Sequence, residues 1–273
     1  MSRIQTVFDS LAQAGRKALI PFITAGDPRP EFTVPMLHAM VEAGADILEL
    51  GVPFSDPMAD GPVIQRASER ALAHHVSLRQ VLEMVTEFRQ RDDETPIVLM
   101  GYLNPIECMG YEAFTGAARQ AGVDGVLIVD LPPEEAREEM LPLLYKVGID
   151  PIFLLAPTST PERVENADNA GRGYLYYVSL KGVTGAGHLD IDEVARKVAG
   201  VRALAELPVG VGFGVKDPET AARMARLADA VVVGSALVSK VEKYGDDLRR
   251  VEEEIVSLLA AMRRAMDEEV TLA

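Results

Sequence analysis

Two carboxylates in the first quarter of the chain stand where acid–base chemistry is possible. Glu49 lies within the apolar run Ile47-Leu48-Glu49-Leu50, and a charge buried among aliphatic side chains is costly unless it has a partner or a task. Asp60 lies in the long connecting segment 51–62. From the residues alone two alternatives stay open, because Glu49 could form a structural ion pair with an arginine and Asp60 could be a helix N-cap.

Other residue types that often carry chemistry are less informative. Asp130 ends a predicted strand, and we expect it to cap the helix that begins near Pro133. No lysine lies inside a predicted strand, which disfavours an amine nucleophile. The four histidines have no metal-ligand spacing and there is one cysteine, so we predict no metal site and expect surface or capping positions for them. They are His38, His74, His75 and His188.

Three glycine-rich segments follow the sixth, seventh and eighth predicted strands. They are 182–187, 210–214 and the Gly234-Ser235 step. Glycine lets backbone N–H groups approach an anion, and the N–H groups at a helix N-terminus bind phosphate. Each segment alone could serve a turn or close packing. Their occurrence on three consecutive strands predicts a site for a phosphate monoester.

Eight short aliphatic and β-branched runs, each followed by a helical pattern, must position these residues. Continuous apolar runs indicate strands that are covered on both faces, and regular alternation with helices indicates parallel connections. We therefore predict an α/β fold, a single (β/α)8 TIM barrel over residues 1–273, whose active site lies at the C-terminal ends of the strands. An additional N-terminal helix at 4–11 is predicted to cover the opposite end. The strand runs are 19–25, 47–52, 97–102, 126–130, 152–156, 174–179, 209–213 and 230–234.

Composition limits the class of partner and compartment. The formal net charge of −15 argues against a general nucleic-acid surface, which needs basic residues. With Cys108 as the only cysteine no intrachain disulfide is possible, and the start of the chain has no apolar stretch typical of a secretory signal. Because no apolar run approaches the roughly 18 residues of a membrane span, we expect a cytoplasmic enzyme.

Two segments resemble the signatures of the tryptophan synthase α chain family. The segment 49–65 reads ELGVPFSDPMADGPVIQ, and GRGYLY at 171–176 is followed by GVTG at 182–185. The similarity runs from PFITAGDP at 21–28 to Gly234-Ser235, which is nearly the whole chain. The resemblance implies a lyase that cleaves indole-3-glycerol phosphate to indole and glyceraldehyde 3-phosphate in tryptophan biosynthesis.

The resemblance also implies roles for individual residues. Glu49 matches the general acid and base, and Asp60 matches the carboxylate that stabilises charge on the ring N–H. No cofactor is expected in this chain, since indole protonated at C3 is itself an electron sink. The implied substrate contacts are the apolar indole pocket of Phe22, Met100, Tyr102, Leu127, Val129 and Leu154, with Tyr176 beside the carboxylates, then Thr184 and the phosphate residues Gly185, Gly214, Gly234 and Ser235.

A partner is expected from the same resemblance. Subunits of this kind pair with a pyridoxal-phosphate β subunit in an α2β2 complex, and indole is a small apolar product that is suited to direct transfer. Prolines and exposed apolar residues at the barrel mouth suit a protein interface. We expect the interface at Pro53, Asp56 and Pro57 in the loop after the second strand, and at Asn104 and Pro105, with Ile106 and Met109, in the loop after the third.

Some residues depart from the family pattern, and two other classes of function fit the sequence less well. Many relatives have Arg-Ser where this chain has Leu180-Lys181, which affects a loop contact rather than the chemistry. An indole-glycerol-phosphate synthase on a related barrel would want a lysine acid at a strand end. A non-catalytic phosphate-binding or allosteric barrel would not need both Glu49 and Asp60.

Overall fold

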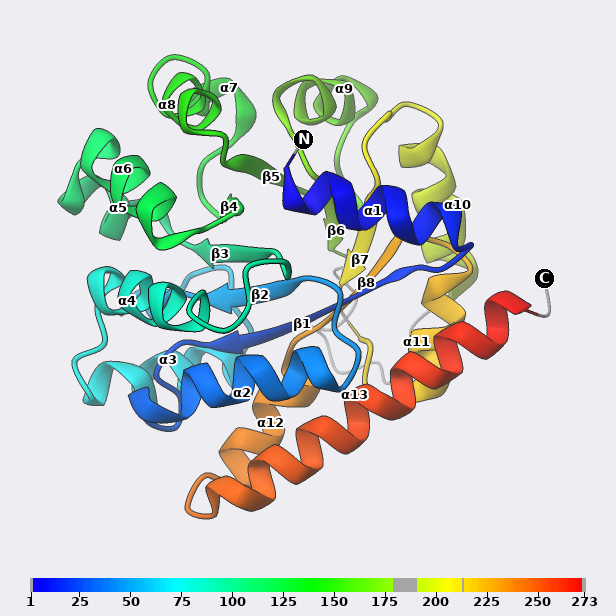
Figure 1. The fold of residues 1–273 in the computed structure, drawn as a ribbon. Helices are drawn as coiled ribbons and strands as arrows, with labels where there is room; N and C mark the ends of the chain where they lie inside the picture. Colours follow the sequence, from blue (N-terminus) through cyan, green and yellow to red (C-terminus); the bar gives the residue numbers. More distant parts are fainter. Residues whose placement is uncertain (1, 179–190, 213, 272–273) are drawn as a thin grey trace.

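The predicted strands form a closed parallel barrel. The computed structural model describes residues 2–178, 191–212 and 214–271. Within these residues each strand pairs in parallel with the next in sequence, and the last pairs with the first (Figure 1). The predicted (β/α)8 fold is therefore confirmed. The strands are β1 (Ala18–Thr24), β2 (Leu48–Gly51), β3 (Ile97–Gly101), β4 (Gly125–Ile128), β5 (Asp150–Leu155), β6 (Leu175–Val178), β7 (Val209–Gly212) and β8 (Ala230–Val233).

The helices of the described residues surround this barrel (Figure 1). Their apolar faces pack on the outer faces of the strands, which explains why the strands read as continuous apolar runs. The helices are α1 (Arg3–Gln13), α2 (Pro30–Glu42), α3 (Pro62–Ala73), α4 (Leu78–Phe88), α5 (Leu103–Met109), α6 (Tyr111–Ala121), α7 (Pro133–Ala136), α8 (Met140–Val147), α9 (Pro161–Ala170), α10 (Ile191–Arg202), α11 (Pro218–Ala225), α12 (Ser235–Tyr244) and α13 (Leu248–Thr271).

Inward-pointing side chains fill the inside of the barrel. Val98 from β3, Leu127 from β4 and Ile152 from β5 are almost completely buried in one cluster, separate from the core between strands and helices. The ring of Tyr174, which directly precedes β6, belongs to the same cluster. The interior is thus a packed layer on which the residues at the strand ends rest.

Helix α1 closes the N-terminal end of the barrel, as predicted. Ile4 and Phe8 are buried against the interior cluster, and the Phe8 ring lies 5.9 Å from that of Tyr174, centroid to centroid. The side chain of Ser2 caps the helix by accepting from the backbone N–H of Gln5. The floor under the interior cluster is therefore a helix with a defined start.

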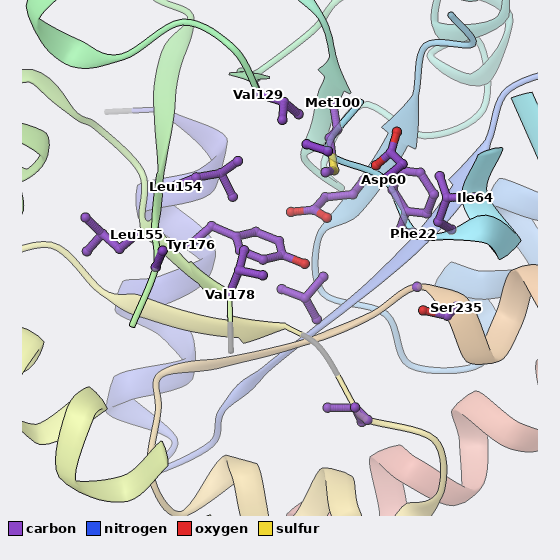
Figure 2. Close-up of a pocket in the computed structure, with 18 of the residues that line it drawn as sticks. Phe22, Asp60, Ile64, Met100, Val129, Leu154, Leu155, Tyr176, Val178 and Ser235 are labelled. Carbon is purple, nitrogen blue, oxygen red and sulfur yellow. The ribbon is translucent and has the colours of Figure 1, made fainter. Parts of the chain in front are cut away.

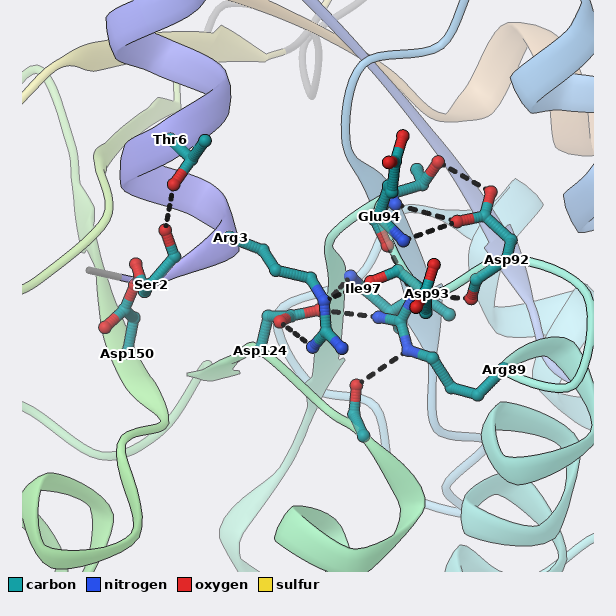
Figure 3. Close-up of polar contacts among 12 residues, drawn as sticks. Ser2, Arg3, Thr6, Arg89, Asp92, Asp93, Glu94, Ile97, Asp124 and Asp150 are labelled. Carbon is teal, nitrogen blue, oxygen red and sulfur yellow. Dashed lines mark hydrogen bonds and ion pairs between the residues drawn. The ribbon is translucent and has the colours of Figure 1, made fainter.

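Polar contacts hold α1 against the start of β5 and against the residue that precedes β4 (Figure 3). Ser2 Oγ donates to Asp150 at 2.6 Å, and Arg3 Nη1 donates to Asp124 at 2.9 Å. Arg89 Nη2 donates to the other oxygen of Asp124 at 2.6 Å. Because Asp124 is 5% exposed, these two guanidinium groups compensate a nearly buried charge at this end of the barrel.

Among the described residues, no helix has both the length and the apolar character needed to cross a membrane.

Candidate active site

A cavity of about 750 Å³ lies at the C-terminal ends of the barrel strands. Figure 2 shows Phe22 and Asp60 on one side of it and Leu154 and Leu155 on the other. The ring of Tyr176 projects between these two sides. Many residues expected at the site from the sequence line this one cavity: Phe22, Glu49, Asp60, Met100, Val129, Leu154, Tyr176, Gly214, Gly234 and Ser235.

Glu49 lies at the base of the cavity on β2 and is completely buried. Its Oε1 accepts a hydrogen bond of 2.5 Å from the hydroxyl of Tyr174, while its Oε2 is buried and has no partner among the described residues. The structure shows a phenol and not an arginine beside it, so the ion-pair alternative is wrong. Burial raises the pKa of Glu49 to about 7, although the Tyr174 bond lowers it.

Asp60 lies in the loop between β2 and α3. Its Oδ2 accepts from the hydroxyl of Tyr102 at 3.2 Å. Helix α3 begins at Pro62 with Gly61 at the N-cap and no side-chain cap, so the capping alternative for Asp60 is wrong. Burial raises the pKa of Asp60 to about 6, against the lowering effect of Tyr102.

The difference in pKa gives the two carboxyl groups different chemistry. A carboxyl group with a pKa of about 7 is protonated in a large fraction of molecules near neutral pH, whereas one with a pKa of about 6 is mostly ionised. Glu49 can therefore donate a proton while Asp60 carries a negative charge. Two carboxyl groups held in different environments in one cavity are typical of general acid–base catalysis.

Tyr174 is a functional neighbour that our sequence reasoning missed. Its side chain is completely buried, and burial together with the adjacent Glu49 raises its pKa well above the ordinary value, so it stays a hydrogen-bond donor. The sequence feature that could have identified Tyr174 is its spacing from Tyr176, because residues two apart along a strand point to the same side. Tyr174 and Tyr176 therefore both face inward, one in the interior cluster and the other in the cavity.

Tyr176 has room in the cavity because its ring lies against Gly212 of β7, two residues beyond its register partner Gly210. A Cβ built on Gly212 would lie 2.1 Å from the Tyr176 hydroxyl oxygen, which no side chain could tolerate. Burial raises the pKa of Tyr176 well above its ordinary value, with contributions from Glu49 and Asp60. The ring therefore presents a neutral hydroxyl among the site residues.

Gly214 and Gly234, two of the glycines predicted to bind phosphate, line the cavity, and Gly234 lies beside Phe22. Gly234 is the N-cap residue of α12, and among the described residues no side chain caps it. Ser235 opens the helix, so the first N–H groups of a ten-residue helix lie at the cavity. Gly214 has a φ of 75°, which favours glycine. Thr184, Gly185 and the Leu180-Lys181 pair lie outside the described residues.

Two residues assigned to the indole pocket lie elsewhere. Leu127 is completely buried in the interior cluster, and Tyr102 is 4% exposed with its hydroxyl bonded to Asp60. Neither is among the described residues that line the cavity. Strand tilt decides which layer a side chain joins, and this cannot be read from one strand alone. Described lining residues that we did not predict include Ile64, Leu155 and Val178.

The residues expected at a partner interface lie around the mouth of the barrel. In the loop after β2, Asp56 is exposed, Pro57 is partly exposed and Pro53 is buried. Met58 in the same loop was not predicted, and its side chain is 84% exposed. The segment after β3 was expected to be a loop, but Asn104 and Pro105 lie in helix α5.

Several other expectations need correction. Ile106 on α5 is 5% exposed and packs in the core, so it is not an exposed interface residue. Asp130 does not cap α7; its Oδ1 accepts from the backbone N–H of Leu103 at the start of α5. His38 stacks on Phe88, with ring centroids 4.6 Å apart, and is partly buried rather than a surface residue. Among the described residues, no group of three or more His, Cys, Asp or Glu could hold a metal ion.

Comparison with known proteins gives one family. The sequence model of the family described as tryptophan synthase alpha chain matches residues 8–268. The tryptophan synthase alpha chain of Methylococcus capsulatus is 65% identical over 267 residues, which are 98% of this chain and 100% of that protein. The corresponding protein of Thioalkalivibrio sulfidiphilus is 62% identical over 267 residues, with the same coverage.

Solved structures agree with these sequences. The crystal structure of tryptophan synthase subunit alpha from Legionella pneumophila superposes with a TM-score of 0.93 at 47% identity, covering 98% of this chain and 99% of that one. A chain of tryptophan synthase from M. tuberculosis, in an open form with BRD0059 bound, gives a TM-score of 0.85 at 36% identity, covering 97% and 99%. Since the family model and these relatives span nearly the whole chain, the chain belongs to the tryptophan synthase alpha chain family.

Proposed function

We propose that the chain cleaves indole-3-glycerol phosphate to indole and glyceraldehyde 3-phosphate with Glu49 as general acid and base and Asp60 as the stabilising carboxylate. The lyase activity is that of the family. The observation that carries the residue roles is the pair of carboxyl groups facing one cavity, the completely buried Glu49 with a pKa of about 7 and the partly buried Asp60 with a pKa of about 6.

The proposed reaction balances its protons on Glu49 alone. Protonated Glu49 gives its proton to C3 of the indole ring, which makes the ring a cation. The carboxylate of Asp60 stabilises the positive charge that this places on the ring N–H. Glu49, now ionised, takes the proton of the hydroxyl on the carbon attached to the ring. The carbon–carbon bond breaks, its electrons return to the ring, and indole and the aldehyde are released.

The apolar part of the cavity suits the ring, and the N-terminus of α12 suits the phosphate. Phe22, Val129 and Leu154 supply apolar surface near the carboxyl groups. Gly234 and Ser235 supply backbone N–H groups and the positive end of a helix dipole, which compensate a phosphate although the chain has a net charge of −15. The reaction as written uses no cofactor and no metal ion in this chain.

The role of Glu49 is tested by incubating the purified chain with indole-3-glycerol phosphate and measuring indole. We expect Glu49→Gln to lower the rate by about 10² to 10⁴, since it removes the proton transfer and keeps the shape. Glu83→Gln, at an exposed position of α4, is the matched control and should retain full activity. A Glu49→Gln variant that keeps more than half the activity would show that Glu49 is structural.

The phosphate site is tested by Gly234→Ala. A Cβ at Gly234 would meet Phe22 at 3.7 Å, an ordinary contact, so the empty protein should accommodate it. We expect a KM that is several-fold higher, because the methyl group crowds the phosphate against its N–H donors. Inorganic phosphate should compete with the substrate of the unmodified chain. Absence of competition together with an unchanged KM would place the phosphate elsewhere.

We also propose that a pyridoxal-phosphate β subunit binds the barrel mouth in an α2β2 complex and receives the indole. The proposed contact residues are Asp56, Pro57, Asn104 and Pro105, while the buried Pro53 lies in the loop that carries the first two. The exposed Met58 side chain would add apolar contact area to this face on docking. The proposed setting is the cytoplasm, where a chain with one cysteine has no need of disulfides.

The partner proposal is tested by titrating β subunit against the rate of indole formation. We expect activation that saturates as the complex forms, and weaker activation of Asp56→Ala. The expected stoichiometry is two chains of each kind by mass measurement. If the rate is independent of β subunit at every concentration, the proposed interface has no support.

A further inference from the structure

Asp60 lies on a loop and not on a strand or helix, so its position depends on what holds the loop. Tyr102, at the end of β3, is the first such residue. Its hydroxyl accepts from the backbone N–H of Ala59 at 3.0 Å and donates to Asp60 Oδ2 at 3.2 Å. One hydroxyl thus fixes both the backbone before Asp60 and the direction of its carboxylate, which requires a group that is donor and acceptor at once.

Tyr102 is itself held firmly. Its side chain is 4% exposed, and the Phe54 ring lies against it at a centroid distance of 5.4 Å. Asp60 offers the neighbouring charge that, with burial, raises the pKa of the Tyr102 phenol. The phenol therefore stays protonated and keeps donating to the carboxylate at any pH where the enzyme would work.

Gln65 holds the same loop from the other end. Its Nε2 donates to the backbone carbonyl of Asp60 at 2.9 Å and reaches the carbonyl of Pro57 at 3.5 Å. Gln65 belongs to α3, and Ala67 of this helix is buried in a cluster with Phe22 and Val238. The amide is thus carried by a packed helix and ties down the loop on the C-terminal side of Asp60.

We propose that Tyr102 and Gln65 are positioning residues for the cleavage of indole-3-glycerol phosphate. Tyr102 orients the carboxylate of Asp60, and Gln65 fixes the backbone of Asp60. This rests on the proposed role of Asp60. It replaces the expectation that Tyr102 contacts indole. An ion at a transition state is stabilised only if the opposing charge is already in place, and a misplacement of about 1 Å can cost about 10² in rate.

The test uses Tyr102→Phe and Gln65→Met, each made in the unmodified chain and in an Asp60→Asn background. Each removes hydrogen bonds and keeps most of the side-chain volume. In the unmodified background we expect kcat to fall about tenfold for Tyr102→Phe, which removes a hydrogen bond to a charged group, and about fivefold for Gln65→Met, which removes hydrogen bonds to neutral carbonyls. For both variants KM should change less than about threefold. In the Asp60→Asn background neither change should lower the rate further, because both act through Asp60.

The pH profile separates the two residues. Tyr102→Phe removes a bond that lowers the pKa of Asp60, so the acidic limb of the kcat profile should move to higher pH. The Gln65 amide bonds only to backbone carbonyls, so Gln65→Met should leave that limb in place. The matched controls are Tyr111→Phe and Gln120→Met on α6, which should change neither kcat nor the profile.

Each other outcome overturns the proposal. If Tyr102→Phe raises KM and remains harmful in the Asp60→Asn background, Tyr102 contacts the substrate. If both changes leave kcat unaltered, the loop is held by other means. If Asp60→Asn alone leaves the activity unchanged, the proposed role of Asp60 fails, and this is seen before the double variants are compared. Gln65 is partly exposed, so Gln65→Met keeps the proposal testable even if Tyr102→Phe does not fold.

Discussion

The burial of Glu49 predicts that this proposed catalytic group destabilises the fold when it is ionised, and that removing its charge stabilises the protein. The pKa of this carboxyl group is 4.5 when exposed and about 7 in the folded chain. The folded chain tolerates the neutral form of Glu49 and not the ionised form. The stability that goes with the neutral form is therefore fully present below pH 4.5 and is lost as the pH rises through about 7. The difference is about 2.5 pH units, and each unit is worth about 1.36 kcal/mol, so ionised Glu49 costs about 3 kcal/mol at pH 8.

The perturbation is Glu49→Gln, which stays neutral at every pH. Its oxygen can still accept from Tyr174, while its amide hydrogens take the place of the unpartnered Oε2 at a cost that does not depend on pH. The informative quantity is thus the change with pH of the difference in unfolding free energy between variant and unmodified chain. Between pH 5 and pH 8 this difference should move by about 2.5 kcal/mol in favour of the variant, whose amide stays neutral.

Urea unfolding of both proteins at pH 5, 6, 7 and 8 measures this difference. The effects of all other titrating groups cancel, because they are common to both chains. Glu83→Gln, at an exposed position, serves as control and should show a gap that is constant with pH. A constant gap for Glu49→Gln as well would refute the argument that Glu49 is desolvated in the folded protein.

Two further outcomes follow from the same cavity. The profile of kcat/KM against pH should be a bell that rises near pH 6, as Asp60 ionises, and falls above about pH 7, as Glu49 loses its proton; a flat profile from pH 5 to 9 would contradict these roles. Gly212→Ala should abolish most activity by displacing Tyr176, while Gly210→Ala, whose Cβ would find its nearest neighbour at 3.4 Å, should be much milder, and equal losses in an indole assay would disprove the steric explanation.

The strands could be predicted from the sequence because each is covered on both faces and so leaves a continuous apolar run. The predicted start at Ile152 and the observed start at Asp150 show the usual error at strand ends, where the pattern fades before the hydrogen bonds do. Glu49 was found by the same logic, since a charge inside such a run is conspicuous. These features are local, and local patterns were sufficient for them.

What could not be predicted depends on contacts between distant segments. Tyr174 meets Glu49 across 125 positions of sequence, and Tyr102 meets Asp60 across 42. Leu127 was placed in the pocket by the family resemblance, but it lies completely buried in the interior cluster. Helix α5 was missed because it is seven residues long and contains Pro105, which a helix tolerates in its first turn.

The two carboxyl groups proposed as catalytic differ in what holds them, and this difference determines which of them a docked partner could move. Glu49 is on a barrel strand, and its phenol partner rests on a packed interior that α1 closes from below. Asp60 is on a loop, and Tyr102 and Gln65 are the described residues from outside that loop that bond to it or to the residue before it. A partner that docks on the loop can therefore change the position of Asp60 without disturbing the barrel. Under our proposal, binding at the barrel mouth should raise turnover through Asp60 and leave the proton chemistry of Glu49 as it is in the isolated chain.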